Sequence, residues 1–451
     1  MKVIKFGGSS VASAQQLKKV LAIVKDDPKR RFVVVSAPGK RHSEDKKVTD
    51  LLIAYYNAAL ANEETSELIQ KIVERYGDIG KELGVDPSIC AAFAEELKEV
   101  QTTLDKNSPY LLDRFLAMGE NLNAQLIAAF FQQEGVSARY INPKELGIIV
   151  SDEPQNARIL DESYDKIYQW HDCEDILVIP GFFGYTKNGD VCTFSRGGSD
   201  ITGSIVAAGV KAEIYENFTD VDGIFAATPQ YIHEPALIKE LTYREMRELS
   251  YAGFTVFHDE ALMPSFKAKI PVVIKNTNNP NCVGTMIKES YDTDSSPNHV
   301  VGVASDGGFC SITINKYLLN REVGFVRRIL QILEDMNISF EHMPSGIDNV
   351  SIIFKECQLT PEAEAKLLER VQKEIEPDEL EMEHNISVIA LVGEGMKEHP
   401  GITAESSAAL ARKNVNLRMI SQGADERSII FAIRGEQERL AVRSLYYTFF
   451  D

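Results

Sequence analysis

Val3-Ile4-Lys5-Phe6-Gly7-Gly8-Ser9-Ser10, near the start of the chain, joins an apolar strand to a glycine-rich turn. Ser13 and Gln16 then form a capping-box pattern, and Leu17, Val20, Leu21 and Val24 fall on one helical face. The run from Arg31 to Ser36 contains four consecutive apolar residues, which is typical of a strand covered on both faces. A strand, a glycine loop, a helix and a second strand in succession predict a parallel sheet.

Predicted helices and buried strands continue to alternate through the first two thirds of the chain. The Asn188-Gly189 pair predicts a hairpin turn. Residues 61–107 are acidic and helical in composition, and we interpret them as a helical excursion from the sheet without a catalytic role. The other predicted elements are helices at 48–60, 111–133, 199–208, 243–252 and 258–268, and strands at 176–180, 212–218 and 271–274.

The last third of the chain contains an internal repeat that follows a polar segment at 291–298, which suits a linker. Residues 324–354 align without a gap with residues 401–431, and Ser351-Ile352-Ile353-Phe354 corresponds to Ser428-Ile429-Ile430-Phe431. Each copy has a strand before it, then a helix, two strands and another helix. Two such βαββαβ units are expected to pack on each other or on a second subunit.

Composition sets broad limits on function. The 451 residues predict two or three domains, and the formal net charge of -19 argues against general binding to nucleic acid or anionic membranes. The six cysteines form no Cys-x-x-Cys pair, and the eight histidines form no metal-binding motif, so we expect buried reduced thiols and no protein metal site. No apolar run is long enough to span a bilayer, and no signal-peptide pattern is present. We therefore expect a cytoplasmic protein.

A second glycine loop, Ser195-Arg196-Gly197-Gly198-Ser199-Asp200, resembles the first in kind. Adjacent glycines allow backbone N–H groups to converge on an anion. Lys5 beside the first loop could neutralise a transferring phosphoryl group, and Arg196 could grip a carboxylate with two parallel hydrogen bonds. The alternatives are a tight turn beside a surface lysine and, for Asp200, a simple helix cap. Neither loop is a Walker A or a Gly-x-Gly-x-x-Gly sequence.

Two further acidic candidates remain ambiguous on the residues alone. Thr219-Asp220-Val221-Asp222-Gly223 follows a predicted strand, where open α/β sheets bind ligands. Its carboxylates could hold a ribose or a magnesium complex, or they could only form an Asp-Gly turn. Glu120 lies on a predicted helix with mixed neighbours, and its residue pattern favours a solvated side chain.

Taken together, these motifs resemble those of the aspartate kinases, within the amino-acid kinase superfamily. The resemblance covers nearly the whole chain and includes Val392-Gly393-Glu394-Gly395-Met396 and Met419-Ile420-Ser421-Gln422-Gly423 in the tail. It is closest to monofunctional, lysine-sensitive enzymes. It implies a mostly parallel central sheet flanked by helices at 1–292, followed by two ferredoxin-like ACT domains at 293–380 and 381–451.

The resemblance implies ATP-dependent phosphorylation of the β-carboxylate of L-aspartate, with Mg²⁺ bridging the phosphates and an amino-acid effector, lysine or threonine, bound to the ACT domains. This is the first step of lysine, threonine and methionine biosynthesis. A carboxylate with a pKa near 3.9 is already ionised at neutral pH, so the nucleophile needs no general base. A homodimer formed through the ACT domains is also implied. The alternatives are a kinase for another acidic amino acid and a catalytically weak amino-acid sensor.

The same resemblance assigns residues to roles. The catalytic residues are Lys5, Gly8 and Asp200. The aspartate-binding residues are Thr49, Glu120, Phe182, Arg196, Gly197, Gly198 and Ser199. The nucleotide-binding residues are Lys5, Gly7, Gly8, Ser9, Thr219, Asp220, Phe225 and Lys275. The effector-binding residues are Gly324, Phe325, Val326, Glu341 and Ser345.

The sequence departs from the family pattern on the nucleotide side. Gln230 and Thr255 stand where the family has cations near the nucleotide phosphates. Lys275, next to Asn276, is our candidate for a replacement. The aspartate-binding motifs show no such departure.

Overall fold

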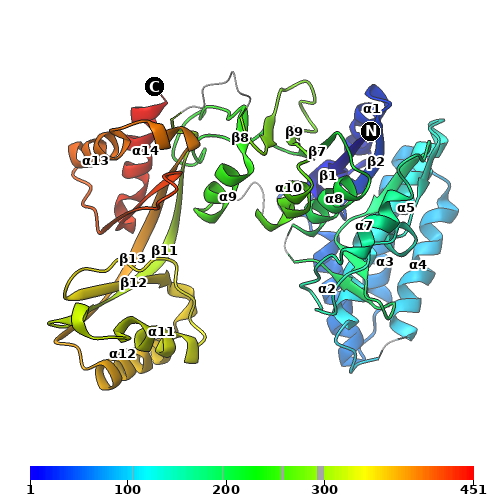
Figure 1. Cartoon of the computed structure of the whole chain (residues 1–451). Helices are drawn as coiled ribbons and strands as arrows, with labels where there is room; N and C mark the ends of the chain where they lie inside the picture. The colour runs from blue at the N-terminus through cyan, green and yellow to red at the C-terminus, as the bar shows by residue number, and fades with distance from the viewer. Residues whose placement is uncertain (104, 196, 255–258, 292–298, 451) are drawn as a thin grey trace. The chain divides into compact units, whose positions relative to one another are not determined.

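The computed structural model describes residues 1–103, 105–195, 197–254, 259–291 and 299–450. Arg196, Thr255 and most of the expected linker lie outside these residues. The chain forms two compact units, each with its own sheet (Figure 1). The first unit comprises Met1–Ile224, Leu237–Met246 and Val256–Tyr291, and the second comprises Phe225–Ala236, Arg247–Thr255 and Asp292–Asp451.

An eight-stranded sheet forms the centre of the first unit. All its neighbouring strands are parallel except β9 and β10. In spatial order the strands are β3 (Ala138–Tyr140), β4 (Ile176–Pro180), β2 (Arg30–Val35), β1 (Lys2–Phe6), β7 (Ile214–Thr219), β9 (Val272–Asn276), β10 (Thr285–Lys288) and β8 (Glu240–Thr242). The mostly parallel sheet that was expected is therefore present.

Helices cover this sheet and extend well beyond it. Helices α2 to α5 contact one another and lie side by side in Figure 1, whereas α8 packs on α7 and α10. Among the described residues, the expected helix at 258–268 is divided into a 3-10 turn and a short helix that begins at Met263, with Pro264 in its first turn. The helical elements are η1 (Gly8–Val11), α1 (Ala14–Asp26), α2 (Val48–Ala61), α3 (Ser66–Leu83), α4 (Pro87–Thr102), α5 (Leu111–Gln133), α6 (Pro143–Leu146), α7 (Glu162–Tyr168), α8 (Gly198–Gly209), α9 (Tyr243–Tyr251), η2 (Asp259–Leu262) and α10 (Met263–Lys267).

Strand alternation in β1 decides which way Lys5 points. Ile4 and Phe6 are fully buried in the core shared with α1 to α5. Side chains alternate between the two faces of a strand, so Lys5 points to the other face, where α8 lies. Register places the carboxyl ends of β1, β2, β4, β7 and β9 at one edge of the sheet. The loops that follow these strands therefore share that edge, where parallel sheets bind ligands.

The second unit is built on one five-stranded antiparallel sheet rather than on two separate small sheets. The long strands β11 and β13 pair along most of their length and run through both halves of the unit (Figure 1). In spatial order the strands are β12 (Asn349–Lys355), β11 (Gly302–Asn315), β13 (Glu379–Val392), β15 (Ser428–Arg434) and β14 (Met419–Gln422). Its helical elements are η3 (Leu319–Arg321), α11 (Phe325–Asp335), η4 (Glu356–Gln358), α12 (Pro361–Ile375), η5 (Glu394–Glu398), α13 (Ile402–Arg412), η6 (Gly435–Gln437) and α14 (Glu438–Phe449).

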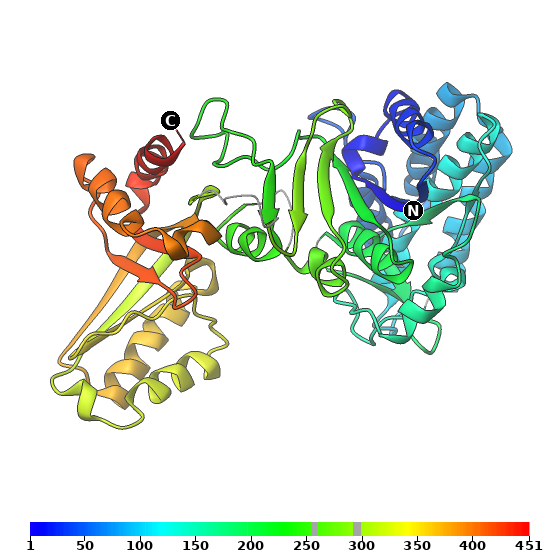
Figure 2. The ribbon, with the colours of Figure 1, turned by 45° about the horizontal axis from the view of Figure 1, so that its top comes forward.

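The internal repeat is visible in this unit (Figure 2). Helices α11 and α13 begin and end at corresponding positions, each after a glycine in the left-handed region, Gly324 at φ 80° and Gly401 at φ 107°. Asn337 and Asn414, which also correspond, follow these helices with φ values of 55° and 54°. The matched backbone geometry supports the repeat that the sequence predicts.

Two composition-based expectations can be compared with the structure. The six cysteines are free, and three of them are buried, but Cys357 is exposed, so the expectation of uniformly buried thiols is wrong for that residue. No helix in the described part of the chain is both long and apolar enough to cross a membrane.

Candidate active site

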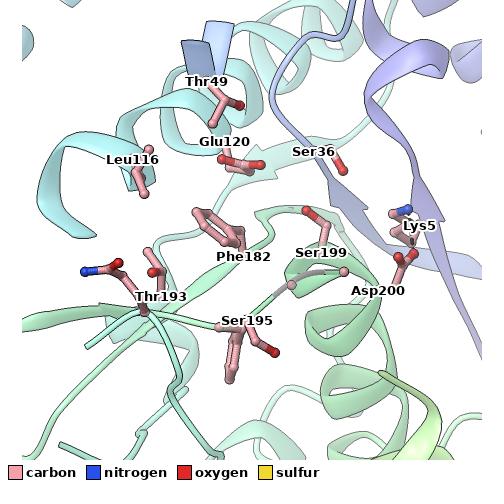
Figure 3. Close-up of a pocket in the computed structure, with 14 residues that line it drawn as sticks. Lys5, Ser36, Thr49, Leu116, Glu120, Phe182, Thr193, Ser195, Ser199 and Asp200 are labelled. Carbon is pink, nitrogen blue, oxygen red and sulfur yellow. Dashed lines mark ion pairs between the residues drawn. The ribbon is translucent and has the colours of Figure 1, made fainter. Parts of the chain in front are cut away.

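A pocket of about 430 Å³ lies in the first unit and contains most of the residues assigned to aspartate (Figure 3). Its volume is in the range of small-molecule sites. The predicted residues that line it are Lys5, Thr49, Glu120, Phe182, Gly197, Gly198, Ser199 and Asp200. Residues far apart in the sequence are thus brought together around one cavity. Arg196 falls outside the described residues.

Lys5 and Asp200 form an ion pair at the edge of this pocket. Lys5 Nζ lies 2.6 Å from Asp200 Oδ1, and Lys5 is only 7% exposed (Figure 3). Asn217 on β7 donates from Nδ2 to the same carboxylate oxygen at 2.7 Å. The Asp200 side chain is therefore engaged with Lys5 and Asn217, and the N-cap residue of α8 is Gly197. The ion pair fixes the position of the Lys5 ammonium.

The second glycine loop is shaped to fit the ring of Phe182. Gly197 precedes α8 with φ 75°, and a Cβ on Gly198 would lie 2.5 Å from Phe182 Cδ2. Phe182 itself has φ 78°, a conformation that is costly for an aromatic residue and that clusters at functional sites. Its backbone N–H donates to Thr202 Oγ1 at 3.0 Å, which helps to hold it there. Side chains larger than glycine are thus excluded beside Phe182.

Glu120 is buried, contrary to the expectation of a solvated side chain. It lies in the middle of α5 and is 8% exposed. Burial raises its pKa to about 7, although hydrogen bonds from the Ala37 backbone and its own backbone and the charge of Lys5 all act to lower the pKa. Near neutral pH the carboxyl group is therefore poised between its two protonation states. A ligand cation would favour the ionised form.

Asp113 on α5, which the sequence analysis did not identify, holds two residues of the pocket wall in place. Its Oδ1 accepts from the backbone N–H of Gln155 at 2.9 Å and from the N–H and hydroxyl of Thr193, both at 2.7 Å. Gln155 and Thr193 line the pocket. Asp113 thus ties β6 (Val191–Thr193), which pairs with β5 (Phe183–Tyr185), to α5.

Of the residues assigned to the nucleotide, Lys5 lines this pocket and Phe225 belongs to the second unit, whereas the others gather at the carboxyl edge of the sheet and do not line the pocket. Gly7 donates its N–H to Phe218 O at 3.1 Å, which joins the first glycine loop to the end of β7. A Cβ on Gly8 would lie 3.0 Å from Ala37 O, so the loops after β1 and β2 touch. Lys275 Nζ lies 5.8 Å from the centre of the Phe218 ring. Thr219, Asp220 and Ser9 belong to the same edge.

The sequence analysis also named four other residues on the nucleotide side, which are Asp222, Phe225, Gln230 and Thr255. Asp222 accepts hydrogen bonds from the side chains of Asn276 and Asn279, which indicates a turn-forming role. Phe225 and Gln230 belong to the second unit. Thr255 lies outside the described residues. Among the described residues, no group of three or more His, Cys, Asp or Glu side chains is placed to hold a metal ion.

The effector-binding candidates belong to different elements of the first repeat. Gly324 caps α11, and Phe325 is buried in the core, so only the backbone of Phe325 is available to a ligand. Ser345 forms an isolated bridge with Val350 at the edge of the sheet. The Glu341 carboxylate accepts a hydrogen bond from the Tyr251 hydroxyl. Val326 is partly buried against the same core as Phe325.

Several residues that line the pocket were not assigned to the site in the sequence analysis. They are Ser36, Leu116, Gln155, Thr193, Phe194 and Ser195. Ser36 could have been found from its place directly after a parallel strand, and Ser195 from its place in the second glycine loop. The other four reach the pocket only through packing, which local patterns do not reveal.

Comparison with known proteins agrees with this geometry. Residues 1–276 match the amino acid kinase family and residues 389–449 match an ACT domain. Aspartokinase 3 of Bacillus subtilis is 50% identical over 450 residues, which cover 100% of this chain and 99% of that protein. The crystal structure of Clostridium acetobutylicum aspartate kinase, an allosteric enzyme, has a TM-score of 0.87 and 38% identity, with 99% of both chains covered.

Escherichia coli aspartokinase III has been solved with aspartate and ADP, and again with lysine and aspartate. Its TM-scores are 0.78 and 0.79 at 23% identity, with all of both chains covered, a likeness that shows the fold alone. The chain belongs to the amino acid kinase family and, within it, to the aspartokinases. Its reaction is the ATP-dependent phosphorylation of the L-aspartate β-carboxylate to 4-phospho-L-aspartate, as the sequence resemblance predicted.

Proposed function

We propose that L-aspartate binds in the pocket with its ammonium at Glu120 and its β-carboxylate directed toward Lys5. The observation that carries this proposal is that a buried carboxylate and a buried ammonium line the same cavity. The ammonium of aspartate would pair with the Glu120 carboxylate and its β-carboxylate with the Lys5 ammonium, so the substrate would bind in one orientation only. The first N–H groups of α8 suit the α-carboxylate, with Arg196 assigned to it by resemblance, and Thr49 and Phe182 would form the walls.

Catalysis in this proposal is positioning and charge neutralisation. The substrate carboxylate is already ionised, so no side chain has to remove a proton. Lys5 would stabilise the negative charge that spreads over the transferring phosphoryl group, and Asp200 would hold Lys5 in place. Backbone N–H groups of Gly8 and Ser9 would contact the phosphate oxygens, while the Gly7 N–H holds the loop to Phe218 O.

Mg²⁺ fits the residues only as a companion of ATP. The ion prefers to keep several waters and to bind substrate phosphates with one or two carboxylates, rather than to sit in an all-protein cage. The described residues offer no such cage. Asp220, which is exposed at the end of β7, would contribute the protein carboxylate. Bound Mg²⁺ supplies charge neutralisation of the nucleotide phosphates, and Lys275 would add a further cation.

A substrate panel tests this orientation. Hydroxamate formation should be followed with L-aspartate, L-glutamate and succinate as acceptors, with ATP, Mg²⁺ and hydroxylamine. Succinate has the same carbon chain as aspartate but no ammonium, so it should give little product. Phosphorylation of succinate at the rate seen with aspartate would rule out the role assigned to Glu120.

We further propose that an amino acid, lysine in preference to threonine, inhibits the enzyme from the start of α11. A helix N-terminus suits an α-carboxylate, and Glu341 and Ser345 would bind the amine. Lysine and threonine should each be titrated against the initial rate. Ser345→Ala should weaken inhibition by lysine without changing the uninhibited rate. If neither lysine nor threonine lowers the initial rate, this assignment is refuted.

We also propose a homodimer formed through the edge of the first repeat. Large apolar side chains in the repeat and directly before it are exposed, and a second copy of the chain would cover them. They are Tyr317, Leu318, Val323, Phe340 and Ile347, and Val323 is fully exposed. Val323→Asp should shift the protein toward monomer in sedimentation at micromolar concentration. Val283→Asp, at a 75% exposed site in the first unit, should not cause this shift, and a wild-type monomer would contradict the proposal.

A further inference from the structure

A buried arginine on α3 connects two loops that border the active-site pocket. Arg75 is 4% exposed, and its Nη2 donates to Gly39 O at 2.8 Å and to Ala12 O at 3.0 Å. Gly39 lies in the loop after β2, and Ala12 lies directly after η1, the turn that follows the first glycine loop. One guanidinium thus holds both segments that follow the two central strands.

The charge of Arg75 is poorly compensated for a group so deeply buried. Its nearest carboxylate oxygen, Asp45 Oδ2, lies 3.4 Å away and also accepts from Arg41. The Arg75 Nε and Nη1 atoms are buried without a hydrogen-bond partner in the described structure. Burial, with the charge of Arg41, lowers the pKa of Arg75. An apolar side chain of similar size would be expected to cost less free energy at such a position, so stability alone does not account for an arginine here.

The loop that Arg75 holds has direct consequences for the pocket. Gly39 donates its N–H to Gly8 O at 2.9 Å, which locks the loop after β2 onto the first glycine loop. Two residues earlier, the Ala37 backbone hydrogen-bonds to the Glu120 carboxylate. Ser36, at the start of this loop, lines the pocket. Displacing Gly39 would therefore disturb the Lys5 end and the Glu120 end of the pocket together.

The next residue of α3 supports the same region from another side. The Tyr76 hydroxyl donates to Gly119 O at 2.7 Å, directly before Glu120. A Cβ on Gly119 would lie 2.9 Å from the Ala37 Cβ, so α5 and the loop after β2 are already in close contact. Arg75 and Tyr76 thus brace the two segments that carry Ala37 and Glu120.

We propose that Arg75 is a positioning residue for phosphoryl transfer, which fixes the 36–45 loop against Gly8 and the Ala37 backbone against Glu120. The proposal rests on the roles given above to Gly8 and Glu120. It assigns a function to the helical segment 61–107, which the sequence analysis interpreted as having no catalytic role. Arg75 touches neither substrate nor nucleotide in this account and acts only through the loop.

The test compares Arg75→Met with Arg75→Lys and with Arg30→Met. Arg30 is also a buried arginine, paired with Glu216 at the opposite end of β2, so its loss should destabilise the fold without moving the loop. Arg75→Met should lower kcat/KM for aspartate by roughly tenfold to a hundredfold, the scale of a misplaced reacting geometry. Arg75→Lys should recover part of this loss, because an ammonium can donate to both carbonyls.

A pH profile separates positioning from a merely structural role. Lys5 from β1 and hydrogen bonds from the backbone of Ala37 and of Glu120 itself lower the pKa of Glu120, and the Glu120 charge in turn raises the pKa of Tyr76 on α3. Loss of the Ala37 hydrogen bond should raise the pKa of Glu120 and move the acid limb of the kcat/KM profile to higher pH by roughly half a unit or more. Arg30→Met should leave the limb unchanged. Tyr76→Phe, which removes a single hydroxyl, provides the same readout if Arg75→Met does not fold, and should shift the limb in the same direction.

An unchanged kcat/KM and an unchanged acid limb in a folded Arg75→Met or Tyr76→Phe protein would overturn the proposal. Wild-type protein that gives no aspartate-dependent product would instead overturn the proposed function, so the two failures are distinguishable.

Discussion

Replacing Glu120 by Gln removes a buried negative charge and preserves the shape of the side chain. Burial raises the pKa of Glu120 from 4.5 to about 7. This difference corresponds to about 3 kcal/mol of folding free energy. The pKa of Glu120 is higher in the folded protein than in the unfolded chain. The free energy of unfolding of wild type is therefore unaffected by this shift below pH 4.5, and it falls as the pH rises through 7. Glu120→Gln should therefore be more stable than wild type by about 3 kcal/mol at pH 8, and by under about 1 kcal/mol at pH 5.

The same substitution should weaken aspartate binding. A hydrogen bond to a charged partner contributes enough that its loss should reduce kcat/KM for aspartate by roughly tenfold to a hundredfold. The ligand-free protein would thus gain stability at pH 8 while the enzyme loses activity. This opposition is expected when a buried charge is retained for function rather than for folding.

Urea unfolding at pH 5 and pH 8, together with aspartate kinetics, measures both effects. Glu213→Gln is a control of opposite sign, because hydrogen bonds from Lys29 and the N-terminus lower the pKa of Glu213 to about 2, so this variant should be less stable than wild type at pH 8. A Glu120→Gln protein that shows no gain in stability between pH 5 and pH 8 would refute the account of Glu120. An unchanged KM for aspartate would refute its role in binding.

Two further substitutions test local geometry and charge. Gly198→Ala should raise the KM for aspartate, because the new methyl group would clash with Phe182. Gly77→Ala, in open space on α3, should instead stabilise the fold by about 0.5–1 kcal/mol. Similar kinetics for both variants would contradict the fit at Phe182. Hydrogen bonds to two glutamates raise the pKa of His384. The protonated side chain therefore stabilises the fold below pH 6.5, and this stabilisation is lost as the pH rises through the folded-state pKa. His384→Gln should lower the unfolding free energy by less than about 1 kcal/mol at pH 5.5 and leave it unchanged at pH 8.5, because the pair is exposed; an effect only at pH 8.5 would contradict this sign.

Local sequence signals predicted the segments whose geometry is local. The first glycine loop, the cap at Ser13 and the ends of α5 follow from residue patterns, and each is present in the structure. Lys5 and Asp200 were both identified from their loops. The carboxyl edge of a parallel sheet gathers such loops by topology, so a correct sheet prediction already brings the site residues together.

Features that depend on packing between distant segments could not be predicted. The burial of Glu120 requires α3 and the 36–45 loop to pack against α5, and its own neighbours in sequence do not reveal this. Strands β3 and β8 have three residues each, too few for an alternation pattern. The single sheet of the second unit arises because β11 and β13 pair beyond the bounds of either repeat.

The central claim, that Lys5 acts on the transferring phosphoryl group in the aspartate pocket, is tested most directly by Lys5→Met. Hydroxamate formation and calorimetric aspartate binding should be measured for wild type, Lys5→Met and Lys29→Met, an exposed lysine in an ion pair with Glu213. We predict aspartate-dependent product for wild type and Lys29→Met, and a loss in kcat of about 10²–10³-fold or more for Lys5→Met with aspartate binding still measurable. Normal turnover by Lys5→Met would contradict the account.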